Sequence, residues 1–273
     1  MHAAAPRRLA DVLRLAAPLS ACLGFAEAWR LAACAALPLR AVLIRLPMGL
    51  RAYALADHLP AALRNALHVF YYGDYEVLGD FAPREGWTVL DVGAFIGLWA
   101  LRAYAAVGEG GRVIALEPNP RAHALCAFNL QINGARRARA LPLALSASSG
   151  RATLYVPECD VNASLREDYA RLFSNELMEV RVRTITLEQL LKRLGVRRVD
   201  LMKVDVEGHE LDVLSAFSRD AAARVKRLVV EVHTDVVSTH EVSEALESLG
   251  YSVAVYVDES LKGQAFVYAK RGS

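Results

Sequence analysis

From residue 85 onward, short runs of β-branched and other apolar residues alternate with stretches whose apolar residues repeat with helical spacing. This alternation predicts a mostly parallel α/β sheet with helices on both faces. The expected strands are 87–92, 112–117, 139–145, 151–156, 179–183, 199–204, 227–233, 251–257 and 264–269. The expected helices are 97–107, 119–133, 187–194, 209–217 and about 235–249. Ligands of such sheets lie at the carboxyl ends of the strands, so we expect the functional site there.

Residues 1–70 follow a different pattern and are rich in alanine and arginine. Two short runs, 40–46 and 50–55, flank a Pro-Met-Gly turn and predict a hairpin, while the segments around them have helical spacing. We therefore expect an N-terminal extension of helices and a short hairpin that packs on the core. Residues 71–273 are expected to form the ligand-binding α/β domain.

The N-terminal region contains no segment that is expected to cross a bilayer. Its longest uncharged run, 15–26, is shorter than the roughly 20 apolar residues that a spanning helix needs. A secretory signal is the alternative, with 26–28 as its cleavage site, but Asp11, Arg14 and Pro18 interrupt the required pattern. We therefore expect a helical cap on the core.

Charge is distributed unevenly along the chain. The net charge is +2, whereas residues 1–60 hold seven arginines against three acidic residues, a net charge of +4. Because the basic residues are scattered and give no broad positive field, no nucleic acid partner is expected. A helix edged by arginine that contacts a membrane surface is the alternative to simple packing. The four cysteines lack metal-binding spacing, which indicates reduced thiols and a cytoplasmic location.

A glycine loop at 90–97 ends the first expected strand and opens the first helix. Gly93 lets the backbone turn tightly and lets a ligand approach the main chain, and Gly97 leaves the amides of the following helix exposed. Asp91 lies at the end of the strand, and Glu117 ends the next strand. A carboxylate at that second place can accept hydrogen bonds from both hydroxyls of a ribose.

The residues around this loop distinguish between two classes of cofactor. A nicotinamide dinucleotide presents a pyrophosphate and requires the Gly-x-Gly-x-x-Gly turn, whereas Phe95 occupies the position two after Gly93. Asp91 would also repel phosphates, while it suits the ammonium group of a methionine moiety. The loop therefore favours S-adenosylmethionine. A nicotinamide-dependent oxidoreductase and a catalytically silent cofactor-binding or membrane-peripheral scaffold are the alternatives.

Four motifs are similar to those of FkbM-type methyltransferases. They are DVGAFIG at 91–97, LEPNP at 116–120, NLQIN at 129–133 and KVDVEG at 203–208. The resemblance covers roughly residues 70–257 and implies the Rossmann-like class I methyltransferase fold, a seven-stranded sheet with one antiparallel strand. It implies S-adenosylmethionine as cofactor, S-adenosylhomocysteine as product, and O-methylation of a saccharide or natural-product hydroxyl.

The resemblance also implies which residues hold the cofactor. They are Asp91, Gly93, Ala94, Phe95, Gly97, Glu117, Pro118, Asn119, Ser146 and Asp205. The chain departs from the family pattern in two places. Phe95 stands where the family often has Asn, and Ala147 stands where it often has Asp. The adenine contact of that missing Asp would then come from the backbone or from Ser146.

Candidate catalytic residues follow the fourth and fifth strands of the expected parallel sheet. Methyl transfer is an in-line displacement, in which alignment lowers the barrier and a base takes the proton of an acceptor hydroxyl. The candidates for this base are Glu207, His233 and His209, in that order. A metal held by Asp205, Glu207, His209 and Glu231 is the alternative, and we expect a site without metal because the turn at Gly208 breaks the extended backbone.

The segment 157–178 separates two expected strands at the same end of the sheet and is expected to form a lid over the acceptor. Asn162 and Ser164 are candidates for binding the hydroxyls of a small molecule or glycan, although the same residues could form only a polar turn. Tyr71 and Tyr72 are expected to pack in the core, and closure over the acceptor, with Tyr72 as a substrate-binding candidate, is the alternative.

Overall fold

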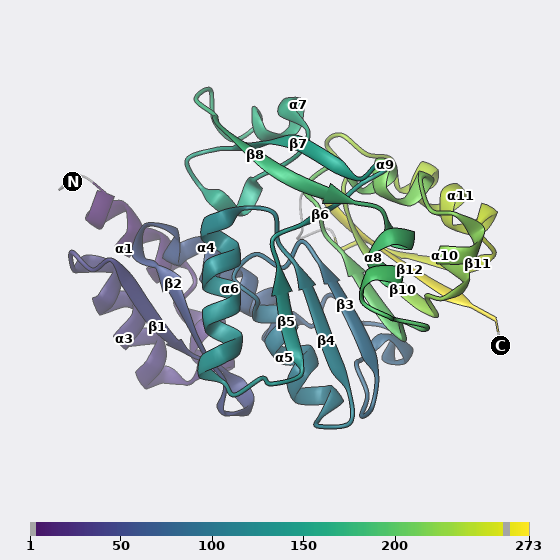
Figure 1. The fold of residues 1–273 in the computed structure, drawn as a ribbon. Helices are drawn as coiled ribbons and strands as arrows, with labels where there is room; N and C mark the ends of the chain where they lie inside the picture. The colour runs from purple at the N-terminus through teal and green to yellow at the C-terminus, as the bar shows by residue number, and fades with distance from the viewer. Residues whose placement is uncertain (1–3, 259–262, 273) are drawn as a thin grey trace.

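A computed structural model describes residues 4–258 and 263–272. Its central sheet has seven strands in the order β11-β12-β10-β9-β3-β4-β5 (Figure 1). β12 is antiparallel to both of its neighbours, and the other neighbouring pairs are parallel. This order confirms the fold expected from the sequence. The strands are β3 (Thr88–Val92), β4 (Arg112–Leu116), β5 (Ala138–Leu141), β9 (Leu201–Val204), β10 (Arg227–His233), β11 (Tyr251–Tyr256) and β12 (Gln264–Arg271).

Helices cover both faces of this sheet. They are α5 (Leu98–Val107), α6 (Pro120–Ile132), α8 (Leu187–Arg193), α9 (Glu210–Ser215), α10 (Arg219–Ala223) and α11 (Thr239–Ser248). Two apolar cores result, because successive strand residues point to opposite faces. Val89 belongs to the core shared with α5 and α6, whereas Leu90 belongs to the core shared with α8 and α11. The sequences of the parallel strands are therefore continuous runs of apolar residues.

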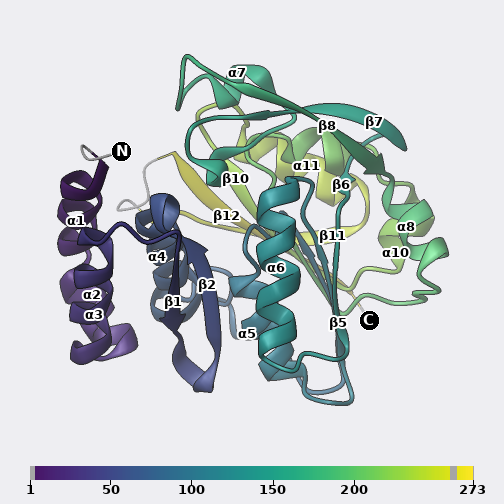
Figure 2. The same ribbon diagram turned by 60° about the vertical axis from the view of Figure 1, so that its left-hand side comes forward.

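The N-terminal region contains the expected helices and hairpin. The helices are α1 (Ala4–Arg14), α2 (Ala16–Leu23), α3 (Phe25–Ala36) and α4 (Leu59–Leu67), and the hairpin pairs β1 (Ala41–Arg45) with β2 (Arg51–Leu55). The hairpin is fastened to α6 by Asn129, whose side chain bonds both backbone groups of Tyr53. Helices α1, α2 and α3 form the outermost layer of the molecule (Figure 2). None of the described helices is long and apolar enough to cross a membrane.

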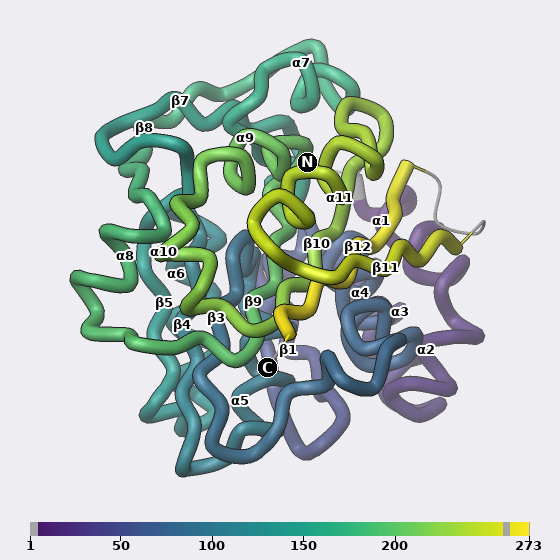
Figure 3. Tube along the Cα trace, turned by 90° about the vertical axis from the view of Figure 1, so that its right-hand side faces the viewer, coloured from purple at the N-terminus to yellow at the C-terminus, as the bar shows by residue number. Residues whose placement is uncertain are grey.

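Short helical turns connect these elements. They are η1 (Pro47–Gly49), η2 (Ala56–His58), η3 (His68–Tyr72), η4 (Gly79–Phe81) and η5 (Asp160–Asn162). Figure 3 shows α8 and α10 on one side of the sheet and α2 and α4 on the other. Residues of α4 belong to the same apolar core as α5, so the extension is continuous with the α/β core. A boundary near residue 70 therefore stays a prediction.

A second, three-stranded sheet lies over the carboxyl end of the main sheet (Figure 1). It consists of β6 (Ala144–Leu145), β8 (Met178–Ile185) and β7 (Gly150–Val156), with η5 and α7 (Glu167–Ala170) in the connection. The expected strand 139–145 is divided here between β5 and β6, which belong to different sheets. Pro142 separates them, because proline has no N–H to donate to a ladder.

Candidate functional site

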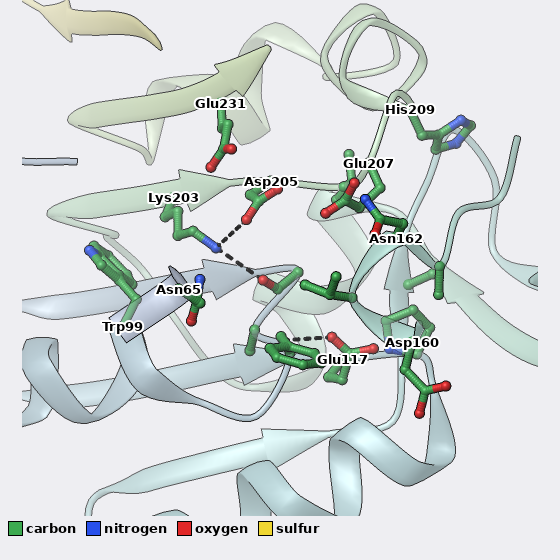
Figure 4. Close-up of a pocket in the computed structure, with 18 of the residues that line it drawn as sticks. Asn65, Trp99, Glu117, Asp160, Asn162, Lys203, Asp205, Glu207, His209 and Glu231 are labelled. Atoms are coloured by element: carbon green, nitrogen blue, oxygen red, sulfur yellow. Dashed lines mark hydrogen bonds and ion pairs between the residues drawn. The ribbon is translucent and has the colours of Figure 1, made fainter. Parts of the chain in front are cut away.

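A cavity of about 440 Å³ lies at the carboxyl ends of β3, β4, β9 and β10 (Figure 4). The loops after these strands supply its floor, α4 and η3 supply one wall, and the segment between β7 and β8 covers it. Several of the residues expected to bind cofactor, acceptor or proton line this cavity. They are Gly93, Ala94, Phe95, Glu117, Pro118, Asn162, Asp205, Glu207 and His209.

The glycine loop has a left-handed backbone at three positions. The φ angles of Gly93, Phe95 and Gly97 are 80°, 48° and 87°. The N–H groups of Gly93 and Ala94 both donate to the carbonyl of Leu116, 3.0 Å away. This conformation is sterically unfavourable for Phe95, because a left-handed φ brings the side chain close to the backbone. The loop thus turns sharply against the end of β4.

Glu117 fastens the glycine loop to the loop after β4. Its two carboxylate oxygens accept hydrogen bonds from the N–H of Phe95 at 2.7 Å and from the N–H of Asn119 at 2.8 Å. The side chain is buried, and this burial raises the pKa of Glu117 to about 8. Each carboxylate oxygen can accept a second hydrogen bond, so Glu117 can hold both loops and still bind a hydroxyl in the cavity.

A buried lysine lies at the centre of the site. The Nζ atom of Lys203 is 3.0 Å from the carbonyl oxygen of Gly93, 3.0 Å from Oδ2 of Asp205 and 3.4 Å from Oδ1 of Asp91. Burial alone would lower the pKa of Lys203, but Asp205 and Asp91 outweigh it and raise the pKa above the usual lysine value. Lys203 is therefore a cation that compensates two carboxylates in the core.

Asp91 lies beneath the cavity instead of lining it. Its side chain is fully buried, and burial raises the pKa of Asp91 to about 6 while Lys203 opposes this rise. The charge partner of Asp91 in this structure is Lys203 and not an open space for a ligand. Lys203 therefore stands between Asp91 and the position where an ammonium group was expected.

Tyr75 joins the acidic groups at the ends of β9 and β10. Its hydroxyl donates to Glu231 through a short hydrogen bond and lies 3.3 Å from Oδ2 of Asp205. Burial raises the pKa of Glu231 to about 7. The ring of Tyr75 also lies under the Lys203 ammonium, 5.1 Å from it. Tyr75 thus bridges Asp205 and Glu231. Figure 4 shows these two carboxylates beside Lys203.

Glu207 and His233 form a second polar group beside Asp205, with Nε2 of His233 3.9 Å from Oδ1 of Asp205. Oε2 of Glu207 accepts a hydrogen bond from the Tyr169 hydroxyl at 2.7 Å and lies 3.4 Å from Nε2 of His233. Nδ1 of His233 lies 2.8 Å from Oε1 of Glu210, which also accepts from the N–H of Gly208. The backbone of Glu207 is left-handed, with φ 54°. Such strain persists only where the surroundings enforce it, and it is common at functional sites.

The protonation of this pair follows from its surroundings. Burial raises the pKa of Glu207 to about 8. Burial would lower the pKa of His233, but the carboxylates of Glu207 and Glu210 outweigh it and hold that pKa well above the usual histidine value. The surrounding carboxylates therefore favour the protonated form of His233, and Glu207 becomes able to accept a proton as the pH rises toward 8.

Comparison with known proteins identifies the family of this chain. The family model described as the methyltransferase FkbM domain matches residues 91–253. The chain belongs to the FkbM methyltransferase family. The match includes the glycine loop, Glu117 and the Glu207–His233 pair, and it decides for S-adenosylmethionine over a nicotinamide dinucleotide as the cofactor of this methyltransferase.

Two relatives illustrate the similarity. The chain is 28% identical over 191 residues to the methyltransferase sdnD of Sordaria araneosa, a match that covers 60% of this chain and 73% of the relative. It is 29% identical over 214 residues to the AMB antimetabolite synthetase AmbE of Pseudomonas aeruginosa, covering 64% of this chain and 10% of that protein. Among solved structures, a SAM-dependent O-methyltransferase from Thermotoga maritima is similar at 14% identity and a TM-score of 0.47, covering 85% of this chain and 78% of that chain.

Several expected cofactor residues of this FkbM methyltransferase lie outside the cavity and support it. Gly97 precedes α5, and a Cβ atom there would lie 2.8 Å from Sγ of Cys126 on α6. The Asn119 side chain accepts from the N–H of Arg121 and caps α6. Ser146 is half-buried beside β8, and its N–H donates to Ile185. These three residues shape the loops without facing the cavity.

Only some of the residues expected to bind the acceptor or act as the base line the cavity. Asn162 lines the cavity, whereas the buried Ser164 hydroxyl donates to the carbonyl of Glu207 at 2.6 Å and supports that residue. Tyr71 and Tyr72 are 48% and 53% exposed and do not line the cavity, so the expected core packing is wrong and the structure shows no contact of Tyr72 with the acceptor space. His209 lies at the rim, turned away from Asp205 (Figure 4), and its Nδ1 atom is 3.0 Å from Asp212. Burial lowers the pKa of His209.

The structure groups the candidate metal ligands differently from the sequence-based alternative. Ligand atoms of Asp205, Glu231 and His233 lie within 4.8 Å of one another, and His209 is not among them. Nζ of Lys203 lies 3.0 Å from Oδ2 of Asp205, beside this group of ligand atoms. A site without metal stays a prediction.

Lys203 and Tyr75 are the site residues that sequence reasoning missed. A signal existed for Lys203, because a lysine inside the otherwise apolar run of a doubly covered strand must have a buried counter-charge. No comparable signal existed for Tyr75, which lies in an irregular segment after η3. Its position becomes evident only when that segment packs under β9 and β10.

Proposed function

We propose that this methyltransferase transfers a methyl group to a hydroxyl of a small saccharide or natural-product acceptor, with Glu207 as the general base. The observation that carries the proposal is the position of the Glu207 carboxylate. It lines the cavity 3.4 Å from Nε2 of His233 and is held by Tyr169 from the covering segment. A base with a raised pKa, placed in a covered cavity, suits removal of a hydroxyl proton.

The cofactor would occupy the part of the cavity lined by the glycine loop and Glu117. Bound S-adenosylmethionine supplies an electrophilic methyl group on its sulfonium sulfur. Glu117 would accept from the ribose hydroxyls, and the backbone at Gly93 and Ala94 would contact the methionine end. Asp205 lines the same floor, and Lys203 fixes the orientation of its carboxylate.

The acceptor would enter between the covering segment and α4. Asn162 contributes an amide that can both donate to and accept from hydroxyl groups, while Leu165 and Phe173 contribute apolar surface. Asn65 and Arg64 line the opposite wall. This mixture of polar and apolar lining suits a small hydroxylated molecule. Alignment of its hydroxyl between Glu207 and the methyl group would provide much of the rate.

The Glu117→Ala variant is expected to lose measurable binding of S-adenosylhomocysteine. Removal of the carboxylate deletes the ribose acceptor and also frees the N–H groups of Phe95 and Asn119. Titration calorimetry would measure the loss, and circular dichroism would check that the fold is retained. Because the alanine also disturbs the loop, Glu117→Gln is the second variant, and it should bind more weakly than the wild type. Unchanged affinity in both variants would contradict the assignment of Glu117.

The pH dependence of kcat/KM is expected to show an ascending limb near pH 8. Glu207 accepts a proton only as the carboxylate, and its pKa of about 8 means that this form is populated as the pH rises through that value. In Tyr169→Phe the limb should move to higher pH, because the Tyr169 hydrogen bond lowers the pKa of Glu207. Glu207→Gln should lose the limb and about 10²-fold or more in kcat. A wild-type profile that is flat from pH 6 to 9 would exclude Glu207 as the base.

A further inference from the structure

The outer helical layer exposes an apolar face to solvent. Leu13 is 41% exposed, Phe25 71%, Trp29 52% and Leu37 50%, and the rings of Phe25 and Trp29 contact each other at 5.9 Å. Every exposed residue of α3 is apolar: Phe25, Ala26, Trp29, Ala33 and Ala36. Two large aromatic side chains held together in water mark an interaction surface.

The charged residues of α3 point the other way. Glu27 is only 7% exposed, and its carboxylate is bonded by Arg30 from the same helix and by Arg45 from β1. A helix on the surface of a soluble protein normally buries its apolar stripe and exposes its charges. In α3 the single carboxylate is turned inward and neutralised there. The outward face of α3 is therefore both apolar and free of acidic groups.

Exposed arginines accompany this apolar face. Arg7 and Arg14 lie about two turns apart on α1, and Arg40 follows α3. The other two acidic residues of residues 4–60 are paired with arginines, Asp11 with Arg14 and Asp57 with Arg8. The unbalanced charge on this side of the molecule is therefore positive, which complements an anionic surface.

We propose that the α1–α3 face docks the protein on an anionic phospholipid bilayer. The Phe25–Trp29 pair and its apolar neighbours would enter the headgroup region, and the arginines would contact lipid phosphates. α3 has 12 residues and cannot span a bilayer, so it would lie in the plane of the interface. A second copy of this chain is the competing occupant, but two copies meeting at this face would bring their excess arginines together. This inference is independent of the proposed methyl acceptor.

Co-sedimentation with lipid vesicles tests the proposal. The wild type should sediment with phosphatidylcholine vesicles that contain phosphatidylglycerol, sediment less with phosphatidylcholine alone, and dissociate in high salt. The Phe25→Ser/Trp29→Ser variant should lose at least about tenfold in vesicle partitioning. The matched control is Val255→Ser/Val257→Ser, which removes two apolar side chains, 49% and 62% exposed, in and directly after the edge strand β11. This control should bind as the wild type does.

Fluorescence locates the contact. Trp99 is buried and Trp87 is half-buried, so Trp29 is the tryptophan placed to enter the lipid. Its emission should shift to shorter wavelength on addition of anionic vesicles, and Trp29→Phe should lose this shift. Equal sedimentation of the wild type and the Phe25→Ser/Trp29→Ser variant would overturn the proposal. The proposal would also be overturned if the wild type is a dimer that does not bind vesicles and the Phe25→Ser/Trp29→Ser variant is a monomer. The exposed face would then be a dimer interface.

Discussion

Gly93→Ala should lower the free energy of unfolding by at least about 3 kcal/mol and abolish binding of S-adenosylhomocysteine. A Cβ atom on residue 93 would lie 1.6 Å from the carbonyl oxygen of Asp205, which belongs to the backbone after β9. Neither partner can move alone, because the N–H of Asp205 donates to Val92 and the N–H of Gly93 donates to Leu116. The methyl group would therefore force β3 and β9 apart where the cofactor is expected.

A glycine elsewhere in the fold separates this collision from simple backbone strain. Gly134 also has a left-handed φ, 65°, but a Cβ atom there would have no neighbour within 4 Å. Gly134→Ala should therefore cost only about 1–2 kcal/mol, the usual cost of placing a side chain in that conformation. Urea unfolding of the two variants would measure the difference. Equal stabilities would show that the close approach of β3 and β9 is not rigid.

Lys203→Met should lower the free energy of unfolding by about 3–5 kcal/mol at neutral pH. The substitution keeps the apolar stem but leaves the buried carboxylate of Asp91 and the partly buried carboxylate of Asp205 without their cation. Binding of S-adenosylhomocysteine should weaken as well, since Lys203 also bonds the carbonyl of Gly93 in the cofactor loop. Urea unfolding and titration calorimetry measure the two effects.

The loss in Lys203→Met should shrink as the pH falls. Burial raises the pKa of Asp91 to about 6, and removal of Lys203, which lowers that pKa, would raise it further. A carboxyl whose pKa is raised by folding stabilises the protein below its unfolded pKa and loses this contribution as the pH rises through its folded pKa. The variant should therefore lose stability more steeply with rising pH than the wild type, so the gap is widest above pH 6.

A surface lysine provides the control for Lys203. Lys270 is half exposed and pairs with Asp80, which is also half exposed. Lys270→Met should cost less than about 1 kcal/mol, because water screens the exposed pair. A similar small cost for Lys203→Met would mean that Asp91 and Asp205 tolerate burial without a cation, and the central role given to Lys203 would be wrong.

Sequence patterns predicted most of the α/β core because its strands are buried on both faces and appear as apolar runs. The class of sheet, the glycine loop and Glu117 follow from that pattern and from the chemistry of their positions. The pattern erred between residues 139 and 145, where an apolar run continues through Pro142 but the chain leaves one sheet for another. Apolar character reports burial, and it does not report which sheet a strand joins.

Glu207 and His233 were both named from the sequence as candidate bases, but their contact with each other was not. Glu207 and His233 lie 26 positions apart and meet only because β9 and β10 are neighbours in the sheet. Tyr169 reaches Glu207 from a segment that folds over the sheet. The protonation of the pair depends on burial and on the carboxylate of Glu210, neither of which is visible in the order of residues.

The glycine loop, the order of strands and helices, and the family were therefore determined by the sequence alone, because each rests on local pattern and residue chemistry. The tertiary structure decided the electrostatics. It placed Lys203 between Asp91 and Asp205, placed Tyr75 between Asp205 and Glu231, and turned Glu27 inward from α3. Charges inside a protein act on one another through space in a medium of low polarity, so their effect depends on distances that only the folded chain defines.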